Sequence, residues 1–181
     1  MVASQQVSAI AITPSSGVLN TTRWVGNQPG QSQINTAIAP FIGSATELYK
    51  QDFGSPTLPN EEGGLAGSYS TSFAADSVAG DGKPADATIT YDGGSYVGSM
   101  AYLLVKDGNH TPAWYLFNLT ALGWNGTDVI SATGFWLGGG AISHVTLYGT
   151  STPAPVPDGG TTAALLGLGM MGIGFMARRK A

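Results

Sequence analysis

The chain has 181 residues, of which 10% are charged and 43% are hydrophobic. Its 27 glycines and 10 prolines exclude a long coiled coil and most helical bundles, because these require long runs of strong helix formers. The net charge of −4 excludes the basic surface that holds nucleic acid, and the absence of cysteine excludes disulfides and thiolate metal sites. What remains is a Gly/Ser/Thr-rich, β-rich domain.

Two strands and a helix are predicted in the first part of the chain. Apolar and polar residues alternate over Gln6–Thr13 and again over Val18–Val25, which is the pattern of half-buried strands. Within Gln31–Ile42, apolar residues such as Ile34 and Ile38 recur at helical spacing, and this predicts a short amphipathic helix.

The rest of the body reads as further short strands joined by Gly-rich turns. Asp92–Gly94 and Asp107–Asn109 are each predicted to close a tight hairpin. Both faces of Trp114–Phe117 are apolar, which predicts a strand covered on both sides. The later strands are predicted at Glu47–Phe53, Ser68–Phe73, Ala87–Tyr91, Tyr96–Lys106, Ala113–Asn118, Asp128–Phe135 and Ala141–Tyr148. The predicted fold is mainly β: an antiparallel β-sandwich of jelly-roll type over residues 1–149, with one short helix.

The C-terminus differs from the body. Residues 1–155 carry four basic and ten acidic residues, whereas Arg178, Arg179 and Lys180 follow a stretch without any charge. The segment Thr161–Ala177 would span about 25 Å as a helix, which is close to a bilayer core. A buried C-terminal helix of the domain is the alternative, but such a helix would show a polar face. We expect residues 161–177 to form a single transmembrane helix, residues 178–181 to stay cytoplasmic, and residues 1–149 to lie outside.

A Pro/Gly linker over residues 150–160 precedes this segment and ends in Val156, Pro157, Asp158, Gly159 and Gly160. A short extended motif, an apolar helix and a basic end therefore follow one another in order. This arrangement closely resembles the PEP-CTERM class of C-terminal sorting domains in its VPD-type variant. The departure is Asp158-Gly159, where the commonest form has Glu-Pro.

The resemblance implies recognition by an exosortase, a membrane-embedded transpeptidase-like enzyme, with cleavage near the motif. It further implies transient anchoring in the inner membrane, then delivery to the cell surface or extracellular matrix of bacteria that make exopolysaccharide and biofilms. Export also needs a signal peptide. The first basic residue is Arg23, and the apolar run Ala9–Ile12 is too short for a signal peptide. We therefore expect a signal that lies upstream of Met1 or was removed before this numbering begins; the alternative is that the apolar tail acts alone as an anchor.

Catalysis is not expected from the body. His110 falls in a turn and His144 in the last long strand, where a lone histidine usually has a structural role. No Gly-x-Ser-x-Gly elbow occurs. Adjacent carboxylates at Glu61 and Glu62 are typical of a solvated patch, whereas glycosidases need two carboxylates held across a cleft. We therefore expect a protein that is not an enzyme.

Ligand binding has two candidate locations. Trp124 and Asn125 lie in the turn Gly123–Gly126 and are the best candidates for an exposed contact, because Trp and Phe elsewhere more often fill a sandwich core. Three aspartates recur every five residues around a Gly-Asp-Gly turn and could bind calcium, although an unliganded acidic loop is the alternative. They are Asp76, Asp81 and Asp86. No other cofactor is expected.

These patterns together predict an exported protein with a structural or adhesive role in an exopolysaccharide or biofilm matrix. Its expected partners are the exosortase, the inner membrane and exopolysaccharide, and nucleic acid is excluded. The alternative is a secreted protein that binds or cleaves carbohydrate.

Overall fold

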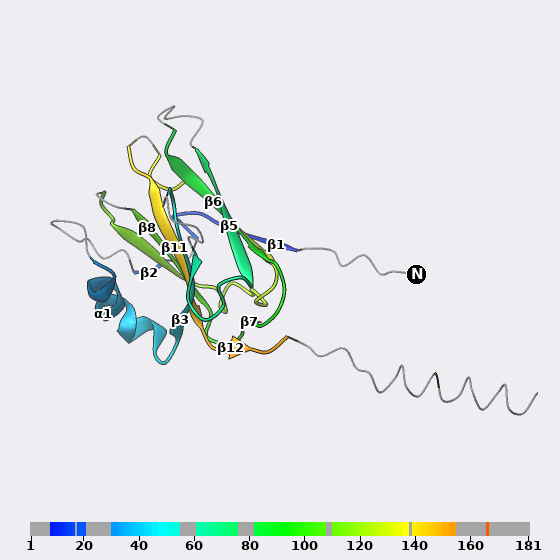
Figure 1. The fold of residues 1–181 in the computed structure, drawn as a ribbon. Coiled ribbons are helices and arrows are strands. Elements are labelled where there is room, and N and C mark those ends of the chain that lie inside the picture. Colours follow the sequence, from blue (N-terminus) through cyan, green and yellow to red (C-terminus); the bar gives the residue numbers. More distant parts are fainter. Residues whose placement is uncertain are drawn as a thin grey trace, which may run out of the picture.

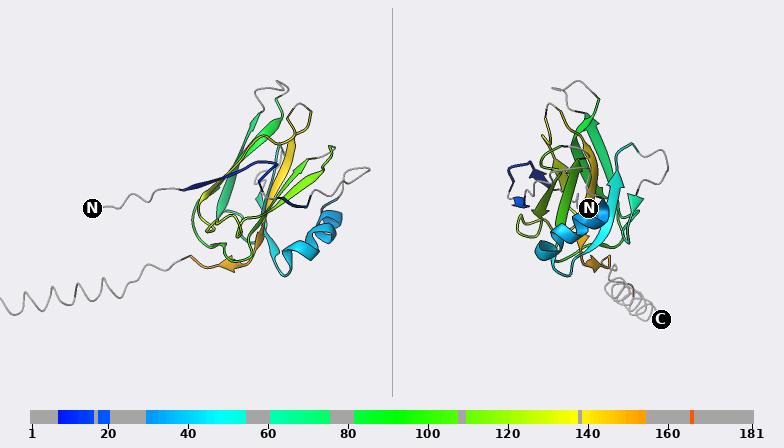
Figure 2. Two further views of the ribbon diagram at one scale, coloured as in Figure 1. Left: turned by 180° about the vertical axis from the view of Figure 1, so that it is seen from behind. Right: turned by 90° about the vertical axis from the view of Figure 1, so that its left-hand side faces the viewer.

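The computed structural model describes residues 8–16, 18–20, 30–54, 61–75, 82–107, 110–137, 139–154 and Leu166. Within them, two β-sheets lie face to face and a helix covers the outer side of one sheet (Figure 1, Figure 2). A small two-stranded sheet lies at the end of the sandwich where β12 precedes the C-terminal segment (Figure 1). The prediction of a mainly β domain with one short helix is confirmed.

The four-stranded sheet has the order β1-β10-β6-β5, and its strands are Ala9–Ile12, Val129–Ala132, Pro84–Tyr91 and Tyr69–Ala75. The six-stranded sheet has the order β2-β9-β8-β11-β3-β4, and its strands are Val18–Asn20, Trp114–Asn118, Tyr102–Asp107, Ile142–Gly149, Thr46–Asp52 and Glu61–Glu62. The small sheet pairs β7 (Tyr96–Val97) with β12 (Ser151–Thr152). β1 pairs with β10 in parallel, so the jelly-roll expectation is wrong here, because a jelly roll is antiparallel.

The core lies between the two large sheets and takes apolar side chains from both. The four-stranded sheet contributes Ile12, Tyr69, Ile89 and Ile130, and the six-stranded sheet contributes Leu103, Val105, Phe117, Val145 and Leu147. β9 has two apolar faces: Phe117 belongs to this core, while Trp114 and Leu116 belong to a second cluster beneath the helix. The prediction that this strand is covered on both sides is confirmed.

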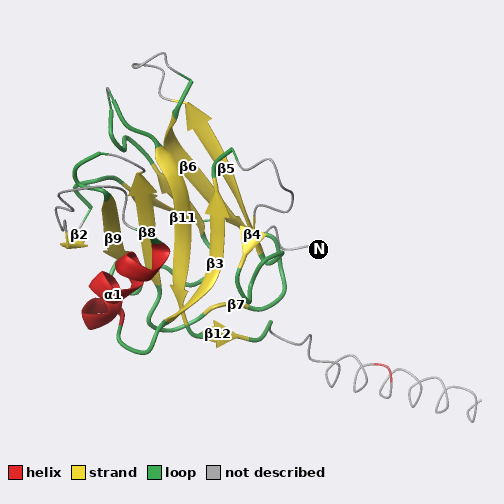
Figure 3. Ribbon diagram, turned by 60° about the vertical axis from the view of Figure 1, so that its left-hand side comes forward, coloured by secondary structure: helices red, strands yellow, loops and turns green. Residues whose placement is uncertain are grey.

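Helix α1 (Gln31–Ile42) has the predicted bounds and lies across the outer face of the six-stranded sheet (Figure 3). Ile34, Ile38 and Ile42 are its buried residues, at the spacing that places them on one face. Polar contacts also hold the helix to the sheet, because Gln31 Nε2 donates to the Tyr148 hydroxyl at 3.0 Å. The result is a three-layer arrangement of sheet, sheet and helix (Figure 2).

The stretch Tyr96–Lys106 was predicted as one strand and forms two, β7 and β8, in different sheets. Met100, with φ of 55°, turns the chain between them. The Asp92–Gly94 turn exists, with positive φ at both glycines, but it does not join a hairpin, because β6 pairs with β5 and β10. The hairpin expected at Asp107–Asn109 is confirmed by antiparallel pairing of β8 with β9.

Other predicted bounds change at the ends of elements. β1 is shorter than the predicted strand Gln6–Thr13, and residues 21–25 of the second predicted strand lie outside the described residues. β4 and β12 were not predicted. β4 contains Glu61 and Glu62, and Glu62 pairs with Lys50 in the register of β3.

Candidate binding site

Two adjoining pockets, of about 340 and 350 Å³, lie at the end of the sandwich where β11 begins. His110 and Gly140 line both of them, and we call the pair the His110 trench. Other residues in its walls are Phe53, Lys83, Asp107 and Ser143 in the first pocket, and Tyr115, Trp136 and Leu137 in the second. The trench therefore combines one imidazole with an aromatic and aliphatic wall.

The His110 imidazole is held by a buried carboxylate. Asp107, at the end of β8, is 2% exposed, and its Oδ1 accepts hydrogen bonds from the His110 backbone N–H at 3.0 Å and from His110 Nδ1 at 3.1 Å. Its Oδ2 accepts the Ala141 N–H at 2.6 Å. Because an ionised carboxylate can only accept, Nδ1 carries the hydrogen, and Nε2 of the neutral ring is a hydrogen-bond acceptor.

Trp136 forms the wall of the second pocket. Its φ of 50° lies in the left-handed region, which costs roughly 1–2 kcal/mol for a residue with a side chain. The ring is fixed nonetheless, because Nε1 donates to the Pro112 carbonyl at 2.8 Å and the ring centroid lies 5.2 Å from that of Tyr115. Leu137 beside it is 59% exposed. Backbone strain of this kind is concentrated at functional sites.

Gly140 is required where the two pockets meet. A Cβ on this residue would overlap the Cβ of Trp136 and lie 2.6 Å from Asp107 Oδ2. We expect Gly140→Ala to lower the free energy of unfolding by about 1–3 kcal/mol, as overpacking does in other cores. Urea unfolding measures this, and Gly139→Ala is the matched control, because its Cβ would meet only His110 Nε2, at 3.9 Å. Equal stability of the two variants would contradict the geometry.

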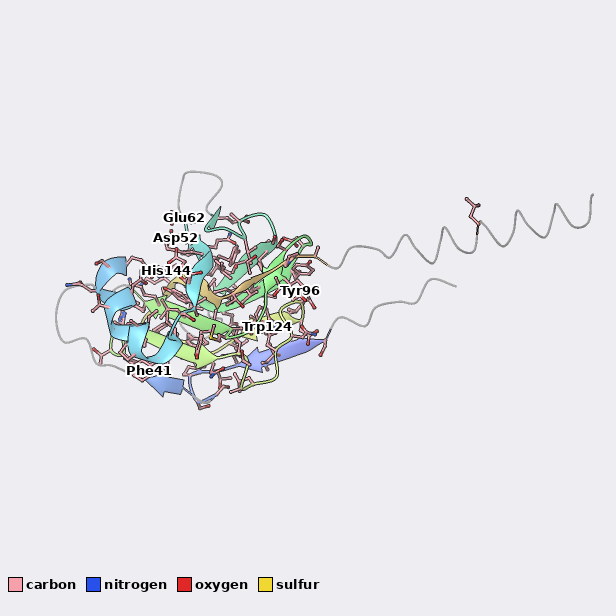
Figure 4. The ribbon with its side chains drawn as sticks, turned by 90° about the horizontal axis from the view of Figure 1, so that it is seen from below. Phe41, Asp52, Glu62, Tyr96, Trp124 and His144 are labelled. Carbon is pink, nitrogen blue, oxygen red and sulfur yellow. The ribbon has the colours of Figure 1, made fainter. Side chains whose placement is uncertain are left out.

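His144 lies elsewhere, on the outer face of the six-stranded sheet. Asp52, His144, Lys106 and Trp114 stand in register across β3, β11, β8 and β9. His144 Nδ1 lies 3.4 Å from Asp52 Oδ1, and Lys50 pairs with Asp52 at 2.9 Å and with Glu62 at 3.4 Å. Figure 4 shows Asp52, Glu62 and His144 together on one side of the molecule. This row does not join the His110 trench.

Burial dominates the electrostatics of this row. Burial first, and then the nearby Lys106 charge, lower the pKa of His144 to about 4 against the opposing effect of Asp52. Burial also lowers the pKa of Lys106. Within the described part of the chain, His144 Nε2, Thr146 Oγ1 and Trp114 Nε1 are buried without a hydrogen-bond partner. Because its pKa is lowered to about 4, His144 is neutral at pH 7.

The expectation that Trp124 is exposed is wrong. Its side chain is 7% exposed, its Nε1 donates to the Asp128 carbonyl at 2.7 Å, and its ring packs near Tyr69 in the main core. Figure 4 places it close to Tyr96, away from His144. Asn125 is exposed, but its Oδ1 accepts the N–H groups of Thr127 and Asp128, both at 2.9 Å, and closes the turn. The turn folds back over the core and offers no platform.

The calcium prediction concerns three aspartates, of which the structure describes Asp86. Asp76 and Asp81 lie outside the described residues, while Asp86 Oδ1 accepts the Gly134 N–H at 2.8 Å. Among the residues that the structure describes, no group of three or more acidic or histidine side chains could hold a metal ion. Calcium at these aspartates remains a prediction.

Most of the C-terminal signal lies outside the described residues. This holds for the sorting motif Val156–Gly160, for residues 161–177 apart from Leu166, and for the basic residues Arg178–Lys180. No helix in the described part of the chain has the length and apolar character needed to cross a membrane.

The chain is a β-sandwich protein with a PEP-CTERM-like C-terminal sorting signal, which implies an exported, envelope-targeted protein processed by exosortase-type machinery. More particularly, residues 155–180 match the family model described as the VPDSG-CTERM motif, so the suspected signal is confirmed. Gly159 stands where the motif's name has serine. No curated protein and no solved structure matches the chain.

The sequence places His110 in a turn and predicts no binding role for it or for Trp136. Asp107 is predicted as a turn residue, although its carboxylate is buried. The signal that could have located the site is the run Trp136-Leu-Gly-Gly-Gly140, where three glycines follow a tryptophan and permit a close approach of backbone to side chain.

Proposed function

We propose that the protein is held briefly in the inner membrane by residues 161–177 and then processed near Val156–Gly160 by an exosortase. The match over residues 155–180 is the observation that carries this proposal. Pro157 restricts the backbone and removes a donor, and the following glycines allow a close approach by an enzyme at the membrane surface. The basic residues Arg178–Lys180 keep the end of the helix on the cytoplasmic side.

The sandwich then belongs to the cell surface or the extracellular matrix. Its role there is structural or adhesive contact with exopolysaccharide in a biofilm, and not catalysis. The position of the trench within the domain supports such contact. β11 begins at the His110 trench and ends, eight residues later, beside β12. The trench therefore lies roughly 25 Å from the end of the sandwich where β12 is found.

A second candidate function is the specific binding of carbohydrate. The lining of the His110 trench favours binding over cleavage. A glycosidase places two carboxylates on either side of the scissile bond. Among the described residues that line the trench, Asp107 is the single carboxylate, and both of its oxygens already accept hydrogen bonds. The described lining offers hydrogen-bond acceptors to a sugar but one carboxylate where a glycosidase uses two.

The sorting proposal is tested by replacing Pro157 and Asp158 together with alanine. We expect this variant to stay membrane-bound at full length, because the exosortase no longer recognises the turn. Replacing Arg178, Arg179 and Lys180 should instead weaken retention and misplace the motif. The measurement is the ratio of membrane-bound to released protein in a host carrying the matching exosortase.

Pro153→Ala is the matched control, because Pro153 is an exposed proline of the same linker outside the motif. It should be released as the unmodified protein is, and the released fraction of the motif variant should fall to that of a host lacking the exosortase. Release of the motif variant at the normal level would show that the motif is only a linker.

A further inference from the structure

We propose that the His110 trench binds a pyranose ring of a surface polysaccharide, stacked on the Trp136 wall and hydrogen-bonded to His110 Nε2. The proposal rests on the polysaccharide contact proposed above and names its site. A pyranose has an apolar face of C–H groups and an edge of hydroxyl groups. The trench presents a partner for each: an apolar wall in one pocket and the imidazole of His110, which lines both pockets.

The apolar partner is the wall formed by Tyr115, Trp136 and Leu137. Tyr115 and Trp136 are half-buried and pack with their ring centroids 5.2 Å apart, so the wall is rigid. Leu137 is the most exposed large apolar side chain of the described sandwich. A solvent-facing apolar wall next to polar groups is typical of a ligand site, since rigid aromatic rings lose little conformational entropy on binding.

The polar partner is His110 Nε2. Because Asp107 fixes the hydrogen on Nδ1, Nε2 offers an acceptor to a sugar hydroxyl, and it has no hydrogen-bond partner among the described residues. The Ser143 hydroxyl donates to the Lys106 carbonyl at 3.0 Å and keeps its oxygen as a second acceptor in the same pocket. Both His110 Nε2 and the Ser143 oxygen are acceptors, so they bind the hydroxyl groups of a ligand and not its carbonyl or carboxylate oxygens.

The site is also pre-organised. Both Asp107 oxygens and the Trp136 Nε1 are engaged by backbone groups, which holds the imidazole and the indole in place before a ligand arrives. Gly140 leaves the space that the Trp136 and Asp107 side chains occupy. The left-handed conformation of Trp136 is unfavourable in itself and is retained here because it aims the ring. Such pre-organisation lowers the entropic cost of binding.

The test uses the full chain purified in a zwitterionic detergent without a sugar headgroup. Tetrasaccharides of glucose, galactose, mannose and glucuronate are titrated in turn. Binding is followed by tryptophan fluorescence and by the histidine Cε1–H signals in NMR spectra. We expect saturable binding of at least one tetrasaccharide, with a shift of the His110 signal and none of the buried His144 signal.

The variants His110→Ala and Trp136→Ala should each weaken that binding by about tenfold or more, which corresponds to one lost hydrogen bond or stacking partner. His110→Ala keeps the backbone N–H bond to Asp107, so it remains informative if Trp136→Ala does not fold. Leu137→Ala should weaken binding by a smaller factor. Leu122→Ala is the matched control, because Leu122 is an exposed leucine outside the trench, and it should bind normally.

Failure of all four tetrasaccharides to bind, or binding that His110→Ala and Trp136→Ala leave unchanged, would overturn the proposal. The sorting proposal is measured separately, by release from the membrane. A protein that is sorted but binds no sugar would therefore refute the trench assignment alone, and a protein that binds sugar but is never released would refute the sorting alone.

Discussion

Replacement of Trp114 by alanine is expected to lower the free energy of unfolding by about 3–5 kcal/mol, the usual cost of deleting a buried tryptophan side chain. Trp114 is fully buried on the outer face of β9, in the cluster that joins helix α1 to the six-stranded sheet. Ile34 and Ile38 of the helix belong to the same cluster. Alanine would leave a cavity in the cluster beneath the helix. Urea unfolding at pH 7 measures the change.

Trp114→Phe separates packing from hydrogen bonding. Trp114 Nε1 is buried without a partner among the described residues, so phenylalanine removes an unsatisfied donor together with part of the ring. We expect this variant to lose less than Trp114→Ala, because the cavity left by phenylalanine is smaller and the unsatisfied donor is gone. Phe41→Ala is the control, because Phe41 lies on the same helix but is partly exposed. A loss from Trp114→Phe as large as that from Trp114→Ala would show that Nε1 has a partner.

Local patterns in the sequence were sufficient for much of this fold. The helix Gln31–Ile42 follows from the spacing of its isoleucines, and the two apolar faces of β9 follow from strict alternation over Trp114–Phe117. Each of these patterns depends on residues within one element. Within one element, the spacing of the apolar residues indicates which face is buried, so the prediction needs no knowledge of the neighbouring strands.

Pairing between elements was harder, because it depends on contacts far apart in the chain. The turn at Asp92–Gly94 has the glycines of a hairpin, yet β6 and β7 diverge into different sheets. β7 pairs with β12, more than fifty residues later, and β1 pairs in parallel with β10. A turn motif specifies that the chain reverses, but not which strand lies beside it.

The candidate site shows the same limit. The His110 trench is formed where the connection after β8 meets the connection between β10 and β11. Neither segment indicates on its own that it faces the other, and the Asp107 carboxylate accepts the Ala141 N–H from the other segment. The prediction that Trp124 is exposed was wrong because a Gly-rich turn favours exposure, whereas this side chain folds back beside Tyr69. The tail was predictable because its signal is linear: motif, apolar stretch and basic end.

The stability of the domain is expected to fall by about 3 kcal/mol between pH 6.5 and pH 4 because of His144. Burial lowers the pKa of His144 from 6.5 to about 4 in the folded protein. The charges facing it are Lys50 and Lys106, which oppose protonation, and Asp52, which favours it. The unfolded chain takes up a proton near pH 6.5 and the folded protein does not, so acid favours unfolding. The contribution is complete above pH 6.5 and is lost as the pH falls towards 4.

The variant His144→Gln tests this assignment, because glutamine keeps a polar side chain but does not titrate. Urea unfolding of both proteins is measured from pH 7.5 to pH 4, and the quantity compared is the difference in unfolding free energy at each pH. Burial raises the pKa of Glu47 as well, but that group titrates in both proteins and cancels in the difference. We expect the difference to change by about 1.4 kcal/mol per pH unit below pH 6.5, the slope of one proton. A difference that stays constant with pH would mean that His144 binds its proton equally in the folded and unfolded chains. That result would contradict its burial beside Lys106 and Asp52 on the outer face of the sheet.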